Sequence, residues 1–135
     1  MRKYRDQSSL TPLIVLQEVS ADRGTTTYTY DAAGNLITRT DARGVVQSIT
    51  YDALNRPTTQ SYTTVANVPA TASTTWRYDE GSNNIGRLTS MHDVSGSTTY
   101  QYDLHGRLLN KNQTVLYGNE SFAHALSYRY DNNGR

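Results

Sequence analysis

The sequence contains no cysteine, which excludes disulfide bonds and thiolate metal sites. It has little proline and only one phenylalanine and one tryptophan among 135 residues. Its one continuous aliphatic run, residues 13–16, is too short for a signal-peptide core or a membrane span. We therefore expect no membrane-spanning segment, and any export signal would have to lie outside this chain.

Neither sign of charge is in excess, since the formal net charge is +1 and acids and bases are interspersed. Phosphate backbones attract a concentrated basic face, so nucleic acid is not an expected partner. Tyrosine is abundant instead, with eleven copies. A tyrosine ring can be buried while its hydroxyl needs a polar partner, which suits half-exposed sheet faces. With 36% hydrophobic residues, the chain is expected to bury little surface on its own.

The dipeptide Tyr-Asp recurs five times and organises the sequence. Each copy is followed by a residue that tolerates positive φ. Asp favours the first position of a type I turn and Gly the last, and a left-handed residue after such a turn gives a bulged hairpin. The predicted structural repeat positions are Tyr30, Asp31, Gly34, Tyr51, Asp52, Asn55, Tyr78, Asp79, Gly86, Tyr102, Asp103, Gly106, Tyr130, Asp131 and Gly134.

The third copy carries four extra residues before its glycine, which predicts a longer hairpin tip. A second kind of turn alternates with the first, at residues 41–44 and 93–96, with a shortened version at 22–24. Strands are expected near 35–40, 45–51, 97–102 and 107–116, and residues 63–71 form a looser connection. No stretch has a helical period of apolar residues.

A second bulky residue stands two positions before each repeat tyrosine, and the residue between them is polar. Strand side chains alternate between faces, so each pair lies on one face. The pairs are expected to form ladders across adjacent hairpins: Tyr28/Tyr30, Ile49/Tyr51, Trp76/Tyr78, Tyr100/Tyr102 and Tyr128/Tyr130. The predicted fold class is all-β, an antiparallel meander of repeated β-hairpins that forms a curved sheet strip.

Two regions are expected: residues 1–21 as a degenerate or incomplete leading repeat, and residues 22–135 as an array of about five hairpin repeats. The chain stops at Arg135, directly after a turn whose return strand would follow. We interpret the chain as an excerpt of a longer array.

Segments such as 27–36 and 100–108 closely resemble the YD repeat of the Rhs family, which also occurs in insecticidal toxin complex components and in teneurins. The resemblance covers about residues 22–135. It implies a β-sheet strip that spirals into a hollow shell around a polypeptide, commonly a C-terminal toxin domain. The family's self-cleavage region includes an Asp-Pro pair, which this chain lacks. Pro57 stands where the repeat usually has Leu, which puts pairing at that strand start in doubt.

Catalysis finds no support in the residue pattern. The histidines His92, His105 and His124 share no metal-ligand spacing. The repeated aspartates could form carboxylate pairs, but their equivalence in five turns favours a structural role. We therefore predict no enzyme activity and no catalytic, metal-binding or cofactor-binding residues.

Two functions remain open. The first is a structural wall segment of a shell in a secreted or cell-surface bacterial protein, with neighbouring repeats and an enclosed polypeptide as partners. The second is an extracellular adhesion or carbohydrate-binding module, because exposed tyrosine rings can stack on sugars and repeated copies add avidity. Tyrosines at alternating strand positions more often pair across a sheet, which favours the first hypothesis.

Overall fold

The computed structural model describes residues 15–131 and 134. Every regular element in this part of the chain is a β-strand, and each strand pairs antiparallel, so the predicted all-β hairpin fold is confirmed. The chain divides into two compact units, Met1–Ser73 and Thr74–Arg135, which are described separately. Most of the predicted leading segment 1–21 lies outside the described residues.

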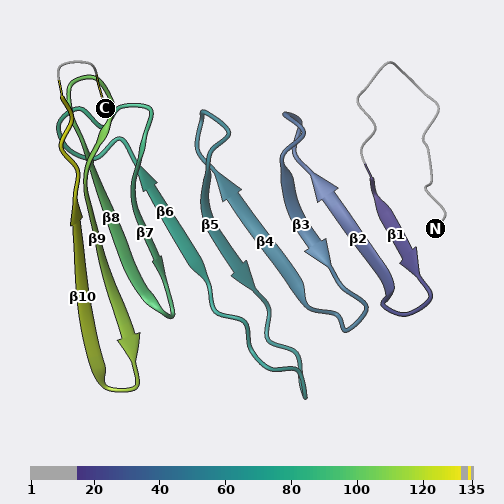
Figure 1. The fold of residues 1–135 in the computed structure, drawn as a ribbon. Helices are drawn as coiled ribbons and strands as arrows, with labels where there is room; N and C mark the ends of the chain where they lie inside the picture. The colour runs from purple at the N-terminus through teal and green to yellow at the C-terminus, as the bar shows by residue number, and fades with distance from the viewer. Residues whose placement is uncertain (1–14, 132–133, 135) are drawn as a thin grey trace. The chain divides into compact units, whose positions relative to one another are not determined.

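The first unit is a meander in which each strand pairs with the next along the chain (Figure 1). Its strands are β1 (Gln17–Ser20), β2 (Gly24–Tyr30), β3 (Leu36–Thr40), β4 (Val46–Tyr51) and β5 (Pro57–Tyr62). Strand β5 begins at Pro57, opposite Tyr51, so the strand pairing starts without delay. Proline is tolerated at the first residue of a strand, which resolves the doubt about this position.

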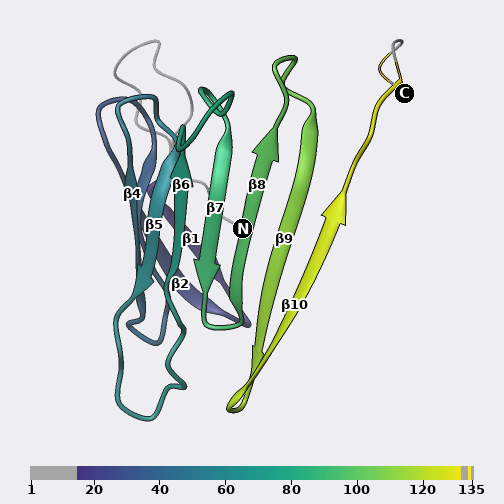
Figure 2. The same cartoon turned by 90° about the vertical axis from the view of Figure 1, so that its left-hand side faces the viewer.

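The second unit repeats the same order of pairing (Figure 2). Its strands are β6 (Thr74–Tyr78), β7 (Leu88–Asp93), β8 (Gly96–Tyr102), β9 (Leu108–Tyr117) and β10 (Glu120–Ser127). The predicted strands agree with β3, β4, β8 and β9 to within one residue at each end. The predicted loose connection lies between β5 and β6, where residues 63–73 contain no strand.

A β-bulge occurs at the same place in four Tyr-Asp hairpins. In each, the register shifts directly before the tyrosine, so that Tyr30 pairs with Leu36 and Tyr102 with Leu108. The equivalent pairs are Tyr51 with Pro57 and Tyr78 with Leu88. A bulge adds one unpaired residue and bends the strand that carries it. The repeated bulges follow from the left-handed residue at the end of each turn, as predicted.

Exposure alternates between the faces along β2, as predicted, but not along β5 or β10, and the ladders of bulky side chains do not form as expected. Strand pairing sets Tyr28 opposite Arg39, Ile49 opposite Gln60 and Tyr100 opposite Lys111. A return strand therefore lies between the tyrosine-bearing strands of adjacent hairpins. Two strand spacings separate their backbones by about 10 Å, too far for direct pairing of the kind we predicted.

The polar residues between the bulky pairs form hydrogen bonds on the opposite face. The hydroxyls of Thr29 and Thr38 lie 2.6 Å apart across the first hairpin. In the second unit Asn110 Nδ2 donates to Gln101 Oε1 at 2.9 Å, and Ser127 Oγ donates to Asn110 Oδ1 at 2.8 Å. Polar cross-strand pairs thus stabilise the face that carries fewer rings.

The turns without tyrosine fall into three kinds. At Asp41, the Gly44 N–H donates to the Asp41 carbonyl at 2.9 Å, as in the repeat turns. At Asp93 the strand ladder continues to the Asp93–Gly96 pair, which leaves a two-residue loop. At the predicted turn 22–24, the Arg23 N–H donates to Ser20 Oγ at 3.3 Å, so serine replaces Asp22 as the capping side chain. The last two turns therefore depart from the predicted Asp-x-x-Gly chemistry.

No hydrophobic side chain is buried among the described residues. The buried residues are polar: Asn84, Thr89, Ser90 and Thr98. An open single-layer sheet leaves both faces accessible, so the hydrophobic contribution to folding is small. Stability must come largely from strand hydrogen bonds and from specific contacts at the turns.

Calorimetric unfolding of the chain should therefore show a heat-capacity increment per residue clearly below the value of about 12–15 cal/mol/K that is usual for compact domains. The reason is that little apolar surface passes from a buried to an exposed state. A measured increment within the usual range would contradict an uncovered sheet and would indicate that the faces are buried in solution.

Candidate functional site

The repeat turns are the feature that recurs most regularly in the described chain. In the first turn the Gly34 N–H donates to the Asp31 carbonyl at 3.1 Å, and the Asp31 N–H donates to the Asn35 carbonyl at 2.9 Å. The second and fourth turns have the same two bonds. The left-handed residues Gly34, Asn55 and Gly106 have φ of 86°, 60° and 80°, as the bulged type I turn requires.

The aspartate carboxylates hold these turns closed. Asp103 Oδ1 accepts the N–H groups of His105 and Arg107, both at 2.9 Å. Asp52 accepts from Leu54 and Arg56 at 2.8 and 3.0 Å, and Asp31 from Ala33 and Asn35 at 2.9 and 2.8 Å. Each carboxylate thus satisfies backbone donors that the tight turn leaves unpaired.

The third and fifth turns also combine an aspartate with a left-handed glycine, but in modified form. In the third, the chain extends over nine residues between β6 and β7, and Gly86 N–H donates to Asp79 Oδ1 at 2.6 Å. Asp79 itself has φ of 65° and Gly86 has φ of 79°. In the fifth, the Gly134 N–H donates to the Asp131 carbonyl at 3.0 Å, and Gly134 also has φ of 79°. The predicted longer tip of the third hairpin is therefore present.

Four of the repeat tyrosines donate their hydroxyl to a backbone carbonyl of the segment before them in the same unit. The Tyr51 hydroxyl donates to the Leu36 carbonyl at 3.0 Å, and the Tyr102 hydroxyl donates to the Leu88 carbonyl at 2.9 Å. Tyr130 donates to Leu108 at 2.8 Å and Tyr30 to Val15 at 3.0 Å. In the pairs with leucine, the acceptor begins the return strand of the preceding hairpin. We call this contact the tyrosine latch. Tyr78 ends β6 at the corresponding position.

Two of the half-buried latch tyrosines, Tyr51 and Tyr102, have a raised pKa. Burial raises the pKa of Tyr51, and the nearby Asp31 carboxylate raises it further. Burial also raises the pKa of Tyr102, with a smaller contribution from Tyr100, against the lowering effect of the Arg87 guanidinium. Both effects keep the hydroxyl protonated, so it remains a donor for the latch.

Sequence reasoning missed the residue that directly follows each left-handed position. Asn35 Nδ2 donates to Asp31 Oδ2 at 2.9 Å, and Arg56 Nε and Arg107 Nε donate to Asp52 and Asp103 at 2.7 Å. The Arg107 guanidinium also lies over the Tyr130 ring at 4.5 Å, and Arg87 over the Tyr102 ring at 5.6 Å. A signal was present in the sequence, since Gly-Arg-Leu occurs at 86–88 and again at 106–108.

These contacts lower the pKa of the turn carboxyls. For Asp31 the main cause is the side-chain hydrogen bond from Asn35, and for Asp52 it is the Arg56 backbone N–H. Burial would raise the pKa of Asp103, but the Arg107 backbone and side-chain donors outweigh it, and the net direction is downward. The ionised form is therefore the one that the folded turn binds best.

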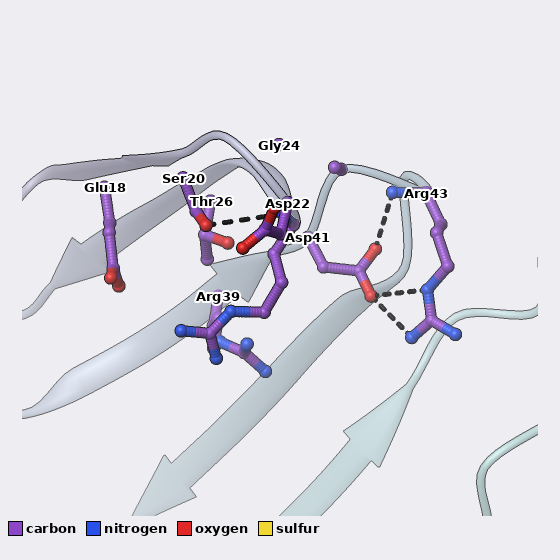
Figure 3. Close-up of a pocket in the computed structure, with 10 residues that line it drawn as sticks. Glu18, Ser20, Asp22, Gly24, Thr26, Arg39, Asp41 and Arg43 are labelled. Atoms are coloured by element: carbon purple, nitrogen blue, oxygen red, sulfur yellow. Dashed lines mark hydrogen bonds and ion pairs between the residues drawn. The ribbon is translucent and has the colours of Figure 1, made fainter. Parts of the chain in front are cut away.

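Two of the surface hollows are large enough for a small ligand. In the first unit a cavity of about 420 Å³ lies beside the turns at 21–23 and 41–44 (Figure 3). Arg43 is paired with Asp41 at 2.6 Å, while Glu18, Asp22 and Arg39 stand around the same cavity without a bond drawn to one another. Acidic and basic groups are balanced there, so no ligand of one charge is favoured.

In the second unit a groove of about 760 Å³ lies between the long third turn and the polar strand face. Glu80, Asn84, Ser90, His92 and Gln101 line it. Asn84 Nδ2 donates to the Glu80 carbonyl, while its buried Oδ1 has no partner among the described residues. Amides and hydroxyls of this kind can bind polar ligands through hydrogen bonds.

Among residues 15–131 and 134, no three His, Asp or Glu side chains are grouped in a way that could hold a metal ion. His92 lies on β7, His124 on β10 and His105 in the fourth turn. The same described residues include no helix long and apolar enough to cross a membrane.

Acid should weaken the fold through the repeat turns. Because the pKa values of Asp31, Asp52 and Asp103 lie below the ordinary 3.8, their contribution is complete above that value and is lost as the pH falls through the lower folded-state pKa. The free energy of unfolding should be level near neutrality and should drop below about pH 4. Asp103→Asn should make this drop shallower in denaturant titrations. An unchanged acid slope would contradict the turn assignment.

Comparison with known proteins agrees with this repeat geometry. The RHS Repeat family model matches residues 15–46, 30–64 and 83–115. The crystal structure of TcdB2-TccC3 is similar over 89% of this chain and 6% of that one, with 20% identity and a TM-score of 0.65. The crystal structure of TcdB2-TccC3-Cdc42 is similar over 88% and 6%, with 20% identity and a TM-score of 0.63.

At this identity the two structures show a shared fold, and the chain spans only 6% of their length. No curated protein matches the chain. The family model covers more than half of the residues, including the first, second and fourth Tyr-Asp turns and part of the third. The chain therefore belongs to the RHS repeat family.

Proposed function

We propose that this chain is a structural wall segment of an Rhs-type β-shell that encloses a polypeptide for delivery, without enzyme activity of its own. In this proposal residues 22–135 are the repeat array and residues 1–21 a degenerate leading repeat. Its partners are the neighbouring repeats and the enclosed polypeptide, and its place is outside the bacterial cell or at its surface.

The tyrosine latch is the observation that carries the proposal. Each latch joins the end of one hairpin to the return strand of the hairpin before it, as Tyr102 does with Leu88. The described hairpins have no buried apolar side chain that would make them independent. Units that cannot bury a core alone, but contact their neighbours specifically, suit a long array in which each repeat stabilises the next.

A strip of this kind has the properties that a container wall needs. Both faces carry many polar groups, and cross-strand pairs such as Thr29 with Thr38 and Thr50 with Thr58 use hydroxyls that would otherwise bind solvent. The bulge in each of four repeat hairpins bends the strand pair in which it lies. Repetition of that bend would give the strip the curvature that closure around a polypeptide requires.

Carbohydrate binding in an adhesion module is the second candidate. The observation in its favour is the groove lined by Asn84, Ser90 and Gln101, whose amides and hydroxyl suit sugar hydroxyls. The tyrosine rings support it less, because the guanidinium groups of Arg87 and Arg107 lie over the rings of Tyr102 and Tyr130, where a sugar would stack.

Substitution of Tyr102 separates the two functions. Tyr102→Phe removes the latch but keeps the ring, and should lower the free energy of unfolding by about 0.5–1.5 kcal/mol. Tyr102→Ala also removes the half-buried ring, and should cost about 1–3 kcal/mol. Both variants are measured by denaturant unfolding and, in parallel, by binding to a glycan array.

Tyr117→Phe is the matched control, because Tyr117 is 80% exposed at the tip of the β9–β10 hairpin, and it should leave stability unchanged. Unchanged stability of both Tyr102 variants together with lost glycan binding would overturn the structural role and would support adhesion.

A further inference from the structure

The residue after the left-handed position of one turn also reaches the left-handed residue of the next turn. Asn35 Nδ2 donates to Asn55 Oδ1 at 2.7 Å. A Cβ built on Gly106 would lie 1.8 Å from Arg87 Nη2, and one on Gly134 would lie 3.5 Å from Arg107 Nη1. Asparagine thus binds the next turn through its amide, Arg87 leaves no room for a side chain at position 106, and Arg107 lies at an ordinary contact distance from position 134.

The Arg87 side chain is held by contacts in its own turn and in the next hairpin. Its Nη1 donates to the carbonyls of Asn83 and Ile85 at 3.2 and 3.0 Å, in its own turn. Its Cζ lies 5.6 Å from the centre of the Tyr102 ring, in the next hairpin. A side chain at position 106 would push the guanidinium away from these partners. The Arg87 guanidinium is the flexible end of its side chain, so it can move to relieve the contact of 1.8 Å, and the cost is the loss of these contacts.

Other turns show that φ alone does not explain Gly106. Gly34 has a similar φ of +86°, but a Cβ built there would meet nothing within 4 Å. Position 55 carries an asparagine in the same left-handed conformation, with φ of 60°. It follows Asn35, which is shorter than arginine and forms a hydrogen bond with that side chain. In this sequence an arginine at this position is thus followed by glycine at the left-handed position of the next turn, and an asparagine is followed by asparagine.

We propose that Arg87 and Asn35, each directly after a left-handed position, are register keys that favour the left-handed residue found in the next turn. Arg87 favours glycine at position 106, whereas Asn35 accepts Asn55 and binds it. Adjacent hairpins thereby recognise each other. Repeats of similar sequence are prone to pair with the wrong neighbour, and a skipped hairpin would bring Asn35 against Gly86 in place of Asn55.

A double-mutant cycle on the whole chain tests the key at the fourth turn. The variants are Gly106→Ala, Arg87→Ala and their combination, with Gly34→Ala as the control of equal backbone strain in open space. Gly34→Ala should raise the unfolding equilibrium constant by about tenfold, from the left-handed conformation alone. Gly106→Ala should raise the unfolding equilibrium constant by a further factor of about three to five, because it also removes the arginine–ring contact.

In the Arg87→Ala background, Gly106→Ala should have only the effect of Gly34→Ala. Equal effects of Gly106→Ala and Gly34→Ala in the parent chain would overturn the proposal. An extra effect of Gly106→Ala that persists without Arg87 would overturn it as well, because the guanidinium would not be its cause.

A reciprocal exchange in the first unit supplies the second arm. Asn35→Arg should destabilise the chain beside Asn55, and Asn55→Gly in the same chain should restore it. Nuclear Overhauser contacts between Thr38 and Ser48 report the pairing of adjacent hairpins, and those between Thr29 and Thr38 report the first hairpin itself.

Asn35→Arg should weaken the Thr38–Ser48 contacts and leave the Thr29–Thr38 contacts in place, a pattern that general destabilisation would not give. If Asn35→Arg does not fold, recovery of the fold by Asn55→Gly is the expected result. No rescue, or an equal effect of Asn35→Arg with and without Asn55→Gly, would overturn the register key.

Discussion

The hydrogen bond from a tyrosine hydroxyl to a carbonyl of the preceding hairpin is the contact on which the repeat architecture depends. A hairpin alone is marginal in water, and the described chain has no apolar core to add stability. The latches of Tyr51, Tyr102 and Tyr130 connect consecutive hairpins at the same position. Each is worth only about 0.5–1.5 kcal/mol, so their effect lies in repetition along the array.

The aspartate and the residue after the turn prepare the latch. Asp103 closes its turn through two backbone N–H groups and also accepts from Arg107 Nε, which fixes the direction of that side chain. The Arg107 guanidinium then lies over the ring of Tyr130, whose hydroxyl reaches Leu108. A local turn motif is thus coupled to the contact between repeats. This explains why Tyr and Asp recur together.

Local chemistry could be predicted from the sequence, and contacts between repeats could not. The left-handed conformation at Gly34, Asn55 and Gly106 follows from residue type and spacing within one turn. The ladder prediction was wrong because alternation within a strand gives the face of Tyr28 but not its neighbour, which is Arg39 of the return strand. The role of Arg87 depends on Tyr102 and Gly106 in the next hairpin, so one repeat alone could not reveal it.

The turn at 93–96 shows the same limit on a smaller scale. Its Asp-x-x-Gly pattern matches that of 41–44, yet the strand ladder reaches Asp93 and Gly96, and the loop has two residues. The carboxylate still accepts the Ser95 N–H at 2.7 Å. Turn type there is decided by the register of β7 against β8, which the four turn residues do not encode.

Amide hydrogen exchange of a chain in which Tyr30, Tyr51, Tyr102 and Tyr130 are all changed to Phe tests the latch most directly. The account predicts faster exchange at amides that pair adjacent hairpins, β3 with β4 and β7 with β8, than at those within hairpins, β2 with β3 and β8 with β9. Unchanged exchange throughout, or equal acceleration at both sets of amides, would contradict the claim that the tyrosine hydroxyls join the repeats.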